Sequence, residues 1–133
     1  MRQLLTALSV LAVSAGSVSA NPALRDVPKI ENAIFDVSVA DKIRKKCDDL
    51  APRMARALSL YSATKQHARD LGYSNEEIDS YTKSKTEKLR IRAKRDAYLS
   101  AQGVVREDPQ SYCAVGRKEI QKSSRIGSLL KEK

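Results

Sequence analysis

Few residues of this chain have the types and spacing that enzyme chemistry requires. His67 is the single histidine among 133 residues, and no carboxylate or nucleophile is patterned with it. We therefore interpret it as a surface or boundary residue rather than a general base. The sequence contains no GxSxG, HExxH, P-loop or dinucleotide-binding glycine motif. We expect a non-enzymatic protein that holds no cofactor and has no metal site.

Two pairs of adjacent carboxylates, Asp48-Asp49 and Glu76-Glu77, are the remaining candidates for acid/base chemistry. Neighbouring residues of a helix point in different directions, so neither pair predicts a catalytic dyad. Residues 74–79, SNEEID, lack the acidic ladder and central glycine of a calcium-binding loop. Negative charge is favourable at a helix N-terminus, and we expect both pairs to lie there.

Residues 1–20, MRQLLTALSVLAVSAGSVSA, have the features of a secretory signal peptide. Arg2 precedes an apolar run from Leu4 to Val13, and small residues lead to Ala20. A bilayer span needs about 20 predominantly apolar residues, and this run is shorter and interrupted by serine. We expect cleavage after Ala20 and a periplasmic protein that consists of residues 21–133 as one domain. Retention of the segment as a membrane anchor is the alternative.

Cys47 and Cys113 are the two cysteines of the chain. In an oxidising compartment an even pair predicts one disulfide. The bond would join the end of the first helix to the head of the fourth, and it requires Cα atoms within about 7 Å of each other. The pair has no CxxC spacing, so a metal site is not indicated. A reduced, reactive thiol is the alternative to the disulfide.

Apolar residues recur at helical spacing, and no long stretch alternates apolar and polar residues, which indicates an all-α fold. We expect a small four-helix bundle-like domain with helices over about 28–48, 49–71, 75–102 and 109–130. A break of the first helix near Ser38 is an alternative. Asp48 or Asp49 would cap the second helix near Pro52.

Residue types at the other helix ends support this division. Ser74 and Glu77 have the spacing of a capping box. Gly72 and Gly103 follow the second and third helices, in the position where a left-handed residue ends a helix. The predicted apolar face of the second helix comprises Met54, Ala57, Leu58, Tyr61, Thr64, Ala68 and Leu71. That of the third comprises Ile78, Thr82, Leu89, Ala93 and Ala97.

Two features of the later helices are candidates for contacts. Residues 83–95 contain seven basic side chains and one acid. The simple interpretation is a solvated helix face with no function of its own. The alternative is a stripe that binds an anion or a partner. The stripe comprises Lys85, Lys88, Arg92 and Arg95.

The fourth helix, which begins at Asp108 and Pro109, contains a heptad series with small residues. The series predicts a close-packing seam that comprises Cys113, Gly116, Ile120, Ser123, Gly127 and Leu130. Glycine in a seam lets another helix approach closely, at a cost in helix propensity. Alternatively, Gly127 ends the helix and the last residues fray.

The chain is basic, with 25 Lys and Arg against 16 Asp and Glu. Removing residues 1–20 removes Arg2 and no acid, which lowers the net charge from +9 to +8. Such a balance often indicates nucleic-acid binding, which an exported protein rarely performs. We expect the protein to bind another protein. The alternatives are contact with an anionic membrane or cell-wall surface, and a role as a stress chaperone. The oligomeric state is left open.

The segment YCAVGRKEIQKSSRIGSLL, with the signal peptide and the single upstream cysteine, resembles an uncharacterised family of small exported alphaproteobacterial proteins. Genes of that family often lie in clusters that encode the proton-pumping NADH dehydrogenase of the respiratory chain. The resemblance implies a partner at the outer face of the inner membrane and an accessory or assembly role there. It supplies no catalytic residues.

Overall fold

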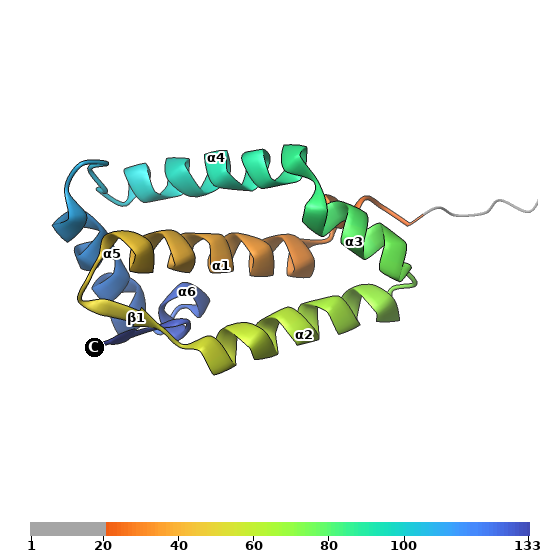
Figure 1. Ribbon diagram of the computed structural model, residues 1–133, viewed down its shortest axis with the longest axis horizontal. Coiled ribbons are helices and arrows are strands. Elements are labelled where there is room, and N and C mark those ends of the chain that lie inside the picture. The colour runs from red at the N-terminus through yellow and green to blue at the C-terminus, as the bar shows by residue number, and fades with distance from the viewer. Residues whose placement is uncertain (1–20) are drawn as a thin grey trace, which may run out of the picture.

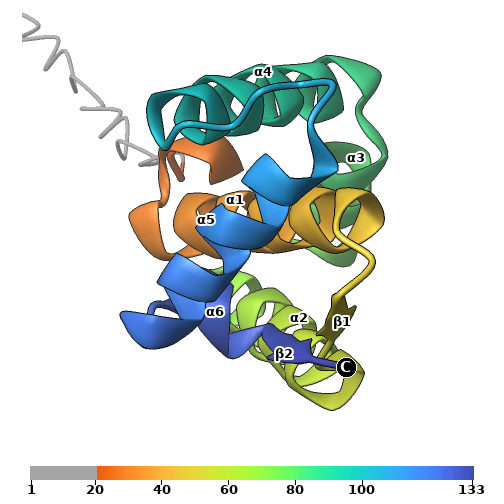
Figure 2. The same cartoon turned by 90° about the vertical axis from the view of Figure 1, so that its left-hand side faces the viewer.

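Three helices run side by side with α1 (Pro28–Lys46) in the middle, between α2 (Met54–Asp70) and α4 (Lys85–Ala101) (Figure 1). The structure is a computed structural model and describes residues 21–133. The fourth longer helix, α5 (Pro109–Gln121), packs with the short α6 (Arg125–Ser128) against the C-terminal half of α1 (Figure 2). The predicted helical fold is confirmed. The predicted signal peptide lies outside the described residues.

Shorter elements complete the described chain. A 3₁₀ turn, η1 (Leu24–Asp26), precedes α1. α3 (Asn75–Lys83) joins α2 to α4. β1 (Leu50–Pro52) and β2 (Leu130–Glu132) pair antiparallel, with Ala51 opposite Lys131. No helix of residues 21–133 has the length and apolar character needed to span a membrane.

α1 holds the two buried clusters of the described chain together. Its residues Val39 and Ile43 are fully buried in the larger cluster, beside Leu50, Leu99 and residues of α5 and α6. Ile30, near its start, belongs to the smaller cluster. The helix is continuous, so the alternative of a break near Ser38 is wrong. The smaller cluster comprises Leu24, Val27, Ile30, Ala68, Tyr73 and Ile78.

Helix ends that carried a local capping signal lie where the sequence placed them. Ser74 and Glu77 form the capping box, with the Glu77 amide donating to Ser74 Oγ at 3.1 Å and the Ser74 amide to Glu77 Oε2 at 2.7 Å. Gly72 and Gly103 have φ angles of +94° and +98°, a conformation that glycine adopts without steric cost. Asp108 accepts a hydrogen bond from the Gln110 amide and caps α5.

The predicted start of the second helix was wrong. Asp48 and Asp49 lie in a turn after α1, and α2 begins only at Met54. The intervening residues form β1, because the C-terminal segment returns and supplies backbone hydrogen bonds at this point. The Arg53 amide donates to the Leu129 carbonyl at 2.8 Å and the Lys133 amide to the Asp49 carbonyl at 3.0 Å.

The predicted third helix is two helices. Ser84 has an extended conformation, and its hydroxyl accepts a hydrogen bond from the Glu87 amide, which ends α3 and starts α4. The break changes which side of α4 faces the core, so Ile91 is buried and Leu89 is 54% exposed. The predicted apolar face beyond Ser84, which was Leu89, Ala93 and Ala97, is therefore wrong, and all three residues are exposed.

The predicted fourth helix is also interrupted. α5 ends at Gln121, and Ser123 has a left-handed φ of 52°, which no helix continues through. Ser124 then caps α6 by accepting a hydrogen bond from the Gly127 amide. The heptad series is therefore not one continuous seam. The alternative of a frayed end at Gly127 is also wrong, because Gly127 lies within α6 and Leu130 begins β2.

Candidate functional site

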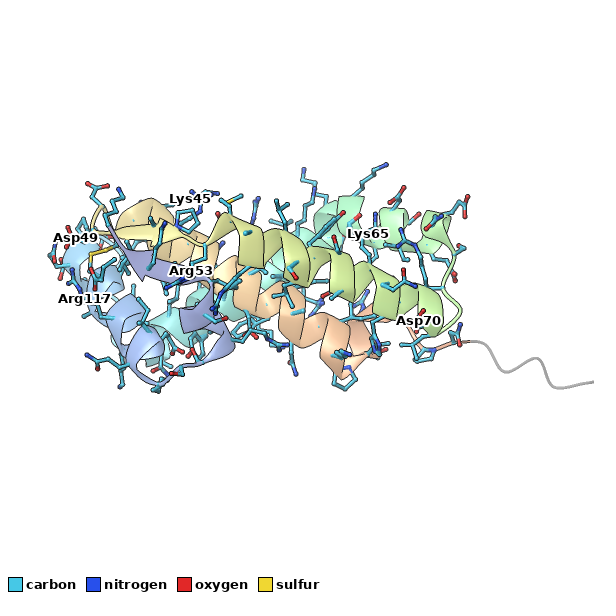
Figure 3. All side chains as sticks on the ribbon, turned by 90° about the horizontal axis from the view of Figure 1, so that it is seen from below. Lys45, Asp49, Arg53, Lys65, Asp70 and Arg117 are labelled. Atoms are coloured by element: carbon cyan, nitrogen blue, oxygen red, sulfur yellow. A yellow bond between two sulfur atoms is a disulfide. The ribbon has the colours of Figure 1, made fainter. Side chains whose placement is uncertain are left out.

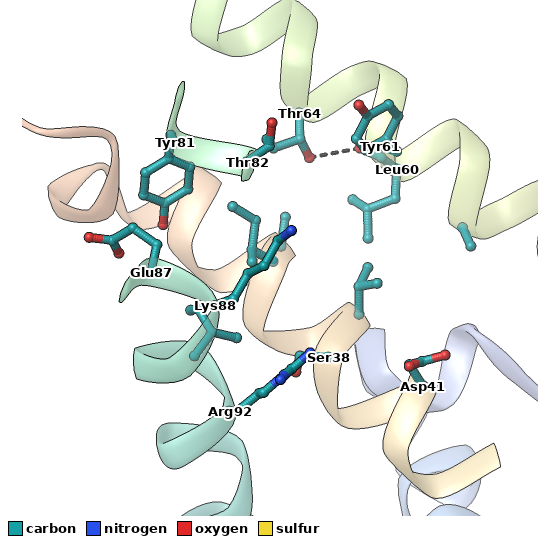
Figure 4. A pocket seen from close by; sticks show the side chains of 15 residues that line it. Ser38, Asp41, Leu60, Tyr61, Thr64, Tyr81, Thr82, Glu87, Lys88 and Arg92 are labelled. Carbon is teal, nitrogen blue, oxygen red and sulfur yellow. Dashed lines mark hydrogen bonds between the residues drawn. The ribbon is translucent and has the colours of Figure 1, made fainter. Parts of the chain in front are cut away.

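A groove of about 470 Å³ runs along α1 on the side that α5 does not cover (Figure 4). Its position follows from helical geometry. Val39 faces α5 and is fully buried, whereas Val37, two residues earlier, lies on the other side and is 36% exposed. α2, α3 and α4 form the remaining walls.

The floor and walls of the groove are mainly apolar. α1 contributes Ala33, Ile34 and Val37 to the floor, with Ser38 and Asp41 at one end. α2 contributes Ala57, Leu60, Tyr61 and Thr64; α3 contributes Tyr81 and Thr82; α4 contributes Glu87, Lys88, Ile91 and Arg92. The Thr64 hydroxyl donates to the Leu60 carbonyl of its own helix at 2.7 Å, so it adds little polarity to the wall.

An exposed apolar ridge on α2 continues the groove outward. Met54, Leu58 and Tyr61 follow one another four and three residues apart, which places them along one side of the helix. They are 56%, 61% and 53% exposed. Tyr61 belongs to both features, since it also lines the groove. The predicted apolar face of α2 is thus divided, with Ala57 and Ala68 turned to the core and this ridge turned to solvent.

The charges around the groove are unequal. The Asp41 carboxylate forms ion pairs with Arg44 and Lys45, with nitrogen–oxygen distances of 2.6 Å in both. The Glu87 carboxylate pairs with Arg90 at 2.8 Å. Lys88 and Arg92 extend from α4 over the groove (Figure 4). Neither has a carboxylate within ion-pair distance among residues 21–133. The acids of the groove are neutralised, and its open charges are positive.

The predicted basic stripe is therefore brought together only in part. Lys88 and Arg92 lie at the groove, and Lys85 is exposed in the first turn of the same helix. The Arg95 guanidinium is mostly buried and donates to Asp96 at 2.8 Å. Arg95 is thus held by a neighbour, and the stripe that remains for a partner is Lys85, Lys88 and Arg92.

A network of buried charges fastens α4 to α1 beside the groove. The Glu31 carboxylate accepts hydrogen bonds from both terminal nitrogens of Arg90, at 2.8 and 2.9 Å, and from Lys94 at 3.2 Å. Arg90 also pairs with Glu87, which in turn pairs with Arg25. Hydrogen bonds from Arg90 and Lys94 lower the pKa of Glu31 below its ordinary value of 4.5, against the effect of burial.

A third buried carboxylate, Glu119, lies near the end of α5, after Glu31 and Glu87. Tyr98 donates to it at 2.6 Å, Lys122 at 3.0 Å, and Ser124 donates as well. Burial acts to raise the pKa of Glu119, but these hydrogen bonds outweigh it and the pKa is lowered. Burial and the bond to Glu119 raise the pKa of Tyr98 to about 12. Glu119 therefore joins α4, α5 and the residue that caps α6.

The predicted disulfide between Cys47 and Cys113 is confirmed, with Cα atoms 5.1 Å apart. Figure 3 shows it at the end of the molecule near Asp49 and Arg117. Arg117 pairs with Asp49 and with Glu132 of β2, both at 2.9 Å. The carboxylate of Asp49 is near the two sulfurs, but sulfurs that are bonded to each other offer no thiolate to a metal.

The residues of the predicted seam have separate roles. A Cβ atom at Gly116 would lie 2.4 Å from Leu50 and 2.9 Å from Ile43, so this glycine lets α5 pack closely against α1 and β1. At Gly127 it would lie 2.1 Å from the Glu119 carbonyl oxygen, so here glycine lets α6 fold back onto α5. Ile120 is half-buried, and Ser123 is exposed at the turn.

Comparison with known proteins adds a family and no function. A model described as "Family of unknown function (DUF5333)" matches residues 22–131. The chain belongs to the DUF5333 family. The match includes the groove and both cysteines. No curated protein and no solved structure matches the chain. The expectation that the chain belongs to an uncharacterised family is thus confirmed.

Sequence reasoning missed the groove and the buried roles of Glu31 and Glu119. Glu31 has no local signal for burial, because Arg90 lies 59 residues away. Glu119 has local partners in Lys122 and Ser124, but Tyr98, which joins it to α4, lies 21 residues away. The break at Ser84 did carry a signal, since Ser84 and Glu87 have the spacing of a capping box inside the basic run. That signal would have placed the start of a separate helix at Lys85.

Proposed function

We propose that the chain is a non-enzymatic, exported helical protein that acts by binding another protein through the groove between α1, α2 and α4. The single observation that carries the proposal is the continuous apolar surface of the groove and the α2 ridge. A contiguous exposed apolar surface with a polar margin is typical of a protein–protein contact.

The compartment and the type of partner are parts of the same proposal. The disulfide between Cys47 and Cys113 favours an oxidising compartment, and the signal-peptide features of residues 1–20 favour the periplasm. The resemblance to exported alphaproteobacterial proteins supports an accessory or assembly role at a membrane complex, with the proton-pumping NADH dehydrogenase as the first candidate.

Co-purification tests the proposal. The tagged protein is recovered from mildly solubilised membranes at low salt, and proteins retained with it are identified. We expect a retained partner that is lost with Leu58→Ser and Tyr61→Ser on the ridge. Leu89→Ser is the matched control, because Leu89 is similarly exposed but lies on the outer side of α4. Recovery of a lone monomer, or equal loss in the control, would contradict the proposal.

A stress-chaperone function is a second candidate, because the ridge of Met54, Leu58 and Tyr61 offers the exposed apolar surface that a holdase needs. Such a protein would suppress aggregation of a denatured client, and Leu58→Ser would weaken the protection. Absence of protection at neutral and at acidic pH would exclude this function while leaving the partner-binding proposal intact.

A further inference from the structure

We infer that the partner segment seated in the groove is an acidic amphipathic helix, an inference that rests on the proposed function and specifies its ligand. The argument begins with shape. Four helices line the groove: α1 forms the floor, α2 and α4 the two sides along it, and α3 contributes Tyr81 and Thr82. A helix laid along this channel would pack against α1, α2 and α4 and place an apolar stripe on Ile34, Val37 and Ile91.

The length of the groove matches a short helix. Its floor on α1 extends from Ala33 to Asp41, which corresponds to about 12 Å at 1.5 Å per residue. Two to three turns of a partner helix would cover it. A bilayer surface fits less well, because the apolar floor is recessed between flanking helices and a flat surface reaches only the outer ridge.

The positive charges beside the groove indicate that the polar side of the partner helix is acidic. Lys88 and Arg92 stand four residues apart on α4, so about 6 Å separates them along the helix axis. Acidic residues three or four positions apart on a partner helix would have the same spacing and would face them. Asp41 and Glu87, the acids of the groove, are already paired within the chain and do not repel such a partner.

The same charges argue against a second copy of this chain as the occupant. Residues 21–133 carry a net charge of +8, and a self-complementary contact through this groove would place Lys88 and Arg92 of both copies near one another. Like charges at a contact oppose association. An acidic partner removes this repulsion and gains attraction from the open cations.

The test uses the purified protein and two synthetic 15-residue peptides. Both carry leucines along one helical face; one has glutamates beside that face and the other has lysines at the same positions. Binding is measured by fluorescence anisotropy, and the site by amide chemical shifts. We expect the acidic peptide to bind at least about tenfold more tightly, to shift Ile34, Val37 and Ile91, and to weaken as salt rises.

Charge reversal provides the matched control. The double variant Lys88→Glu/Arg92→Glu should lose the acidic peptide and bind the basic one. Lys118→Glu/Lys131→Glu makes the same change in net charge at exposed positions outside the groove, on α5 and β2, and should leave the preference unchanged. An equal response in both double variants would show long-range attraction only and would overturn the inference.

Four further outcomes would overturn it. The first two are equal binding of both peptides and no binding of either. The others are displacement of the acidic peptide by phosphatidylglycerol vesicles, and sedimentation of the protein as a dimer that the acidic peptide dissociates. A different result distinguishes failure of this inference from failure of the proposed function. A partner that is lost with Leu58→Ser but shows no acidic-peptide preference would keep the groove as a protein-binding site and remove only the acidic helix.

Discussion

Val39 and Val37 lie two residues apart on α1, and their surroundings differ in every respect. Val39 is fully buried on the closed face of α1, which α5, α6, the paired strands and the disulfide cover. Val37 lies on the open face, which is the groove. The comparison teaches that α5, α6 and the strands close one side of the central helix and leave a groove on the other. The other side is therefore available for binding without a large cost in stability.

The largest effect is expected from removal of the disulfide on the closed face. The disulfide joins residues 66 positions apart, and a loop of this length corresponds to about 4 kcal/mol as an upper estimate. In Cys47→Ser/Cys113→Ser the melting temperature should fall on the order of 10 °C or more. Thermal unfolding followed by circular dichroism measures it. Reductant should lower the wild type and leave the variant unchanged; equal melting temperatures would contradict the prediction.

Added volume on the closed face comes next. Gly127→Ala places a methyl group against the backbone of Glu119, and Gly116→Ala places one against the side-chain ends of Leu50 and Ile43. Overpacking costs about 1–3 kcal/mol, and we expect the larger loss at Gly127 because backbone yields less than a side chain. Urea unfolding compares the two. Gly103→Ala is the control, since its Cβ meets no atom within 4 Å of the described chain and only the left-handed conformation opposes it.

A smaller effect is expected where charges hold α4 to α1. Glu31→Gln removes a carboxylate that Arg90 and Lys94 share, and we expect a loss of about 1–2 kcal/mol because both cations are partly exposed. Since the pKa of Glu31 is lowered on folding, its contribution is present above its ordinary value of 4.5. The contribution is lost as the pH falls below that value through the pKa of the folded state.

The difference between wild type and Glu31→Gln should therefore be full at pH 7 and shrink below pH 4.5. Unfolding in urea across pH 3–7 measures it. Acid sensitivity that persists in the variant is expected from Glu119, Asp41 and Asp96, whose pKa values are lowered as well. A difference that stays constant down to pH 3 would contradict the role of the Glu31 carboxylate.

The smallest effect on stability is expected on the open face. Leu58→Ser should change the free energy of unfolding by no more than about 0.5 kcal/mol, because the side chain is mostly exposed. Leu89→Ser should do the same, so only loss of the partner distinguishes the two variants. A loss above 1 kcal/mol for Leu58→Ser would place the ridge in the core and remove the contrast between the faces.

Local signals in the sequence predicted the local features of the fold. Capping residues such as Ser74 and Asp108 located helix starts, Gly72 and Gly103 located ends, and the two cysteines predicted their bond. The strands could not be found this way. Each strand has three residues, which are too few to show an alternating pattern. The partner of Leu50 is Glu132, which is distant in the sequence.

The site was less predictable than the fold, for a physical reason. Lys88 and Arg92 were singled out by charge, but the groove beside them exists only because α5 covers one side of α1 and leaves the other uncovered. Which side is covered depends on Gly116 and the turn at Ser123, whose contacts are tertiary. The exposed ridge on α2 was likewise interpreted as core, since Met54 and Leu58 have the spacing of a buried face.

The pairing of β1 with β2 also bears on when the domain can fold. Residues 50–52 are made well before residues 130–132, which pair with them. Until the later segment is made, Ile43, Cys47 and Leu50 lack the cover that Ile126, Leu129 and Leu130 provide, so the larger core is incomplete. Native contacts between segments so far apart in sequence delay folding until the later segment has been made. A chain that we propose is exported would thereby stay unfolded, and able to pass through a membrane channel, until residues 130–132 have been synthesised.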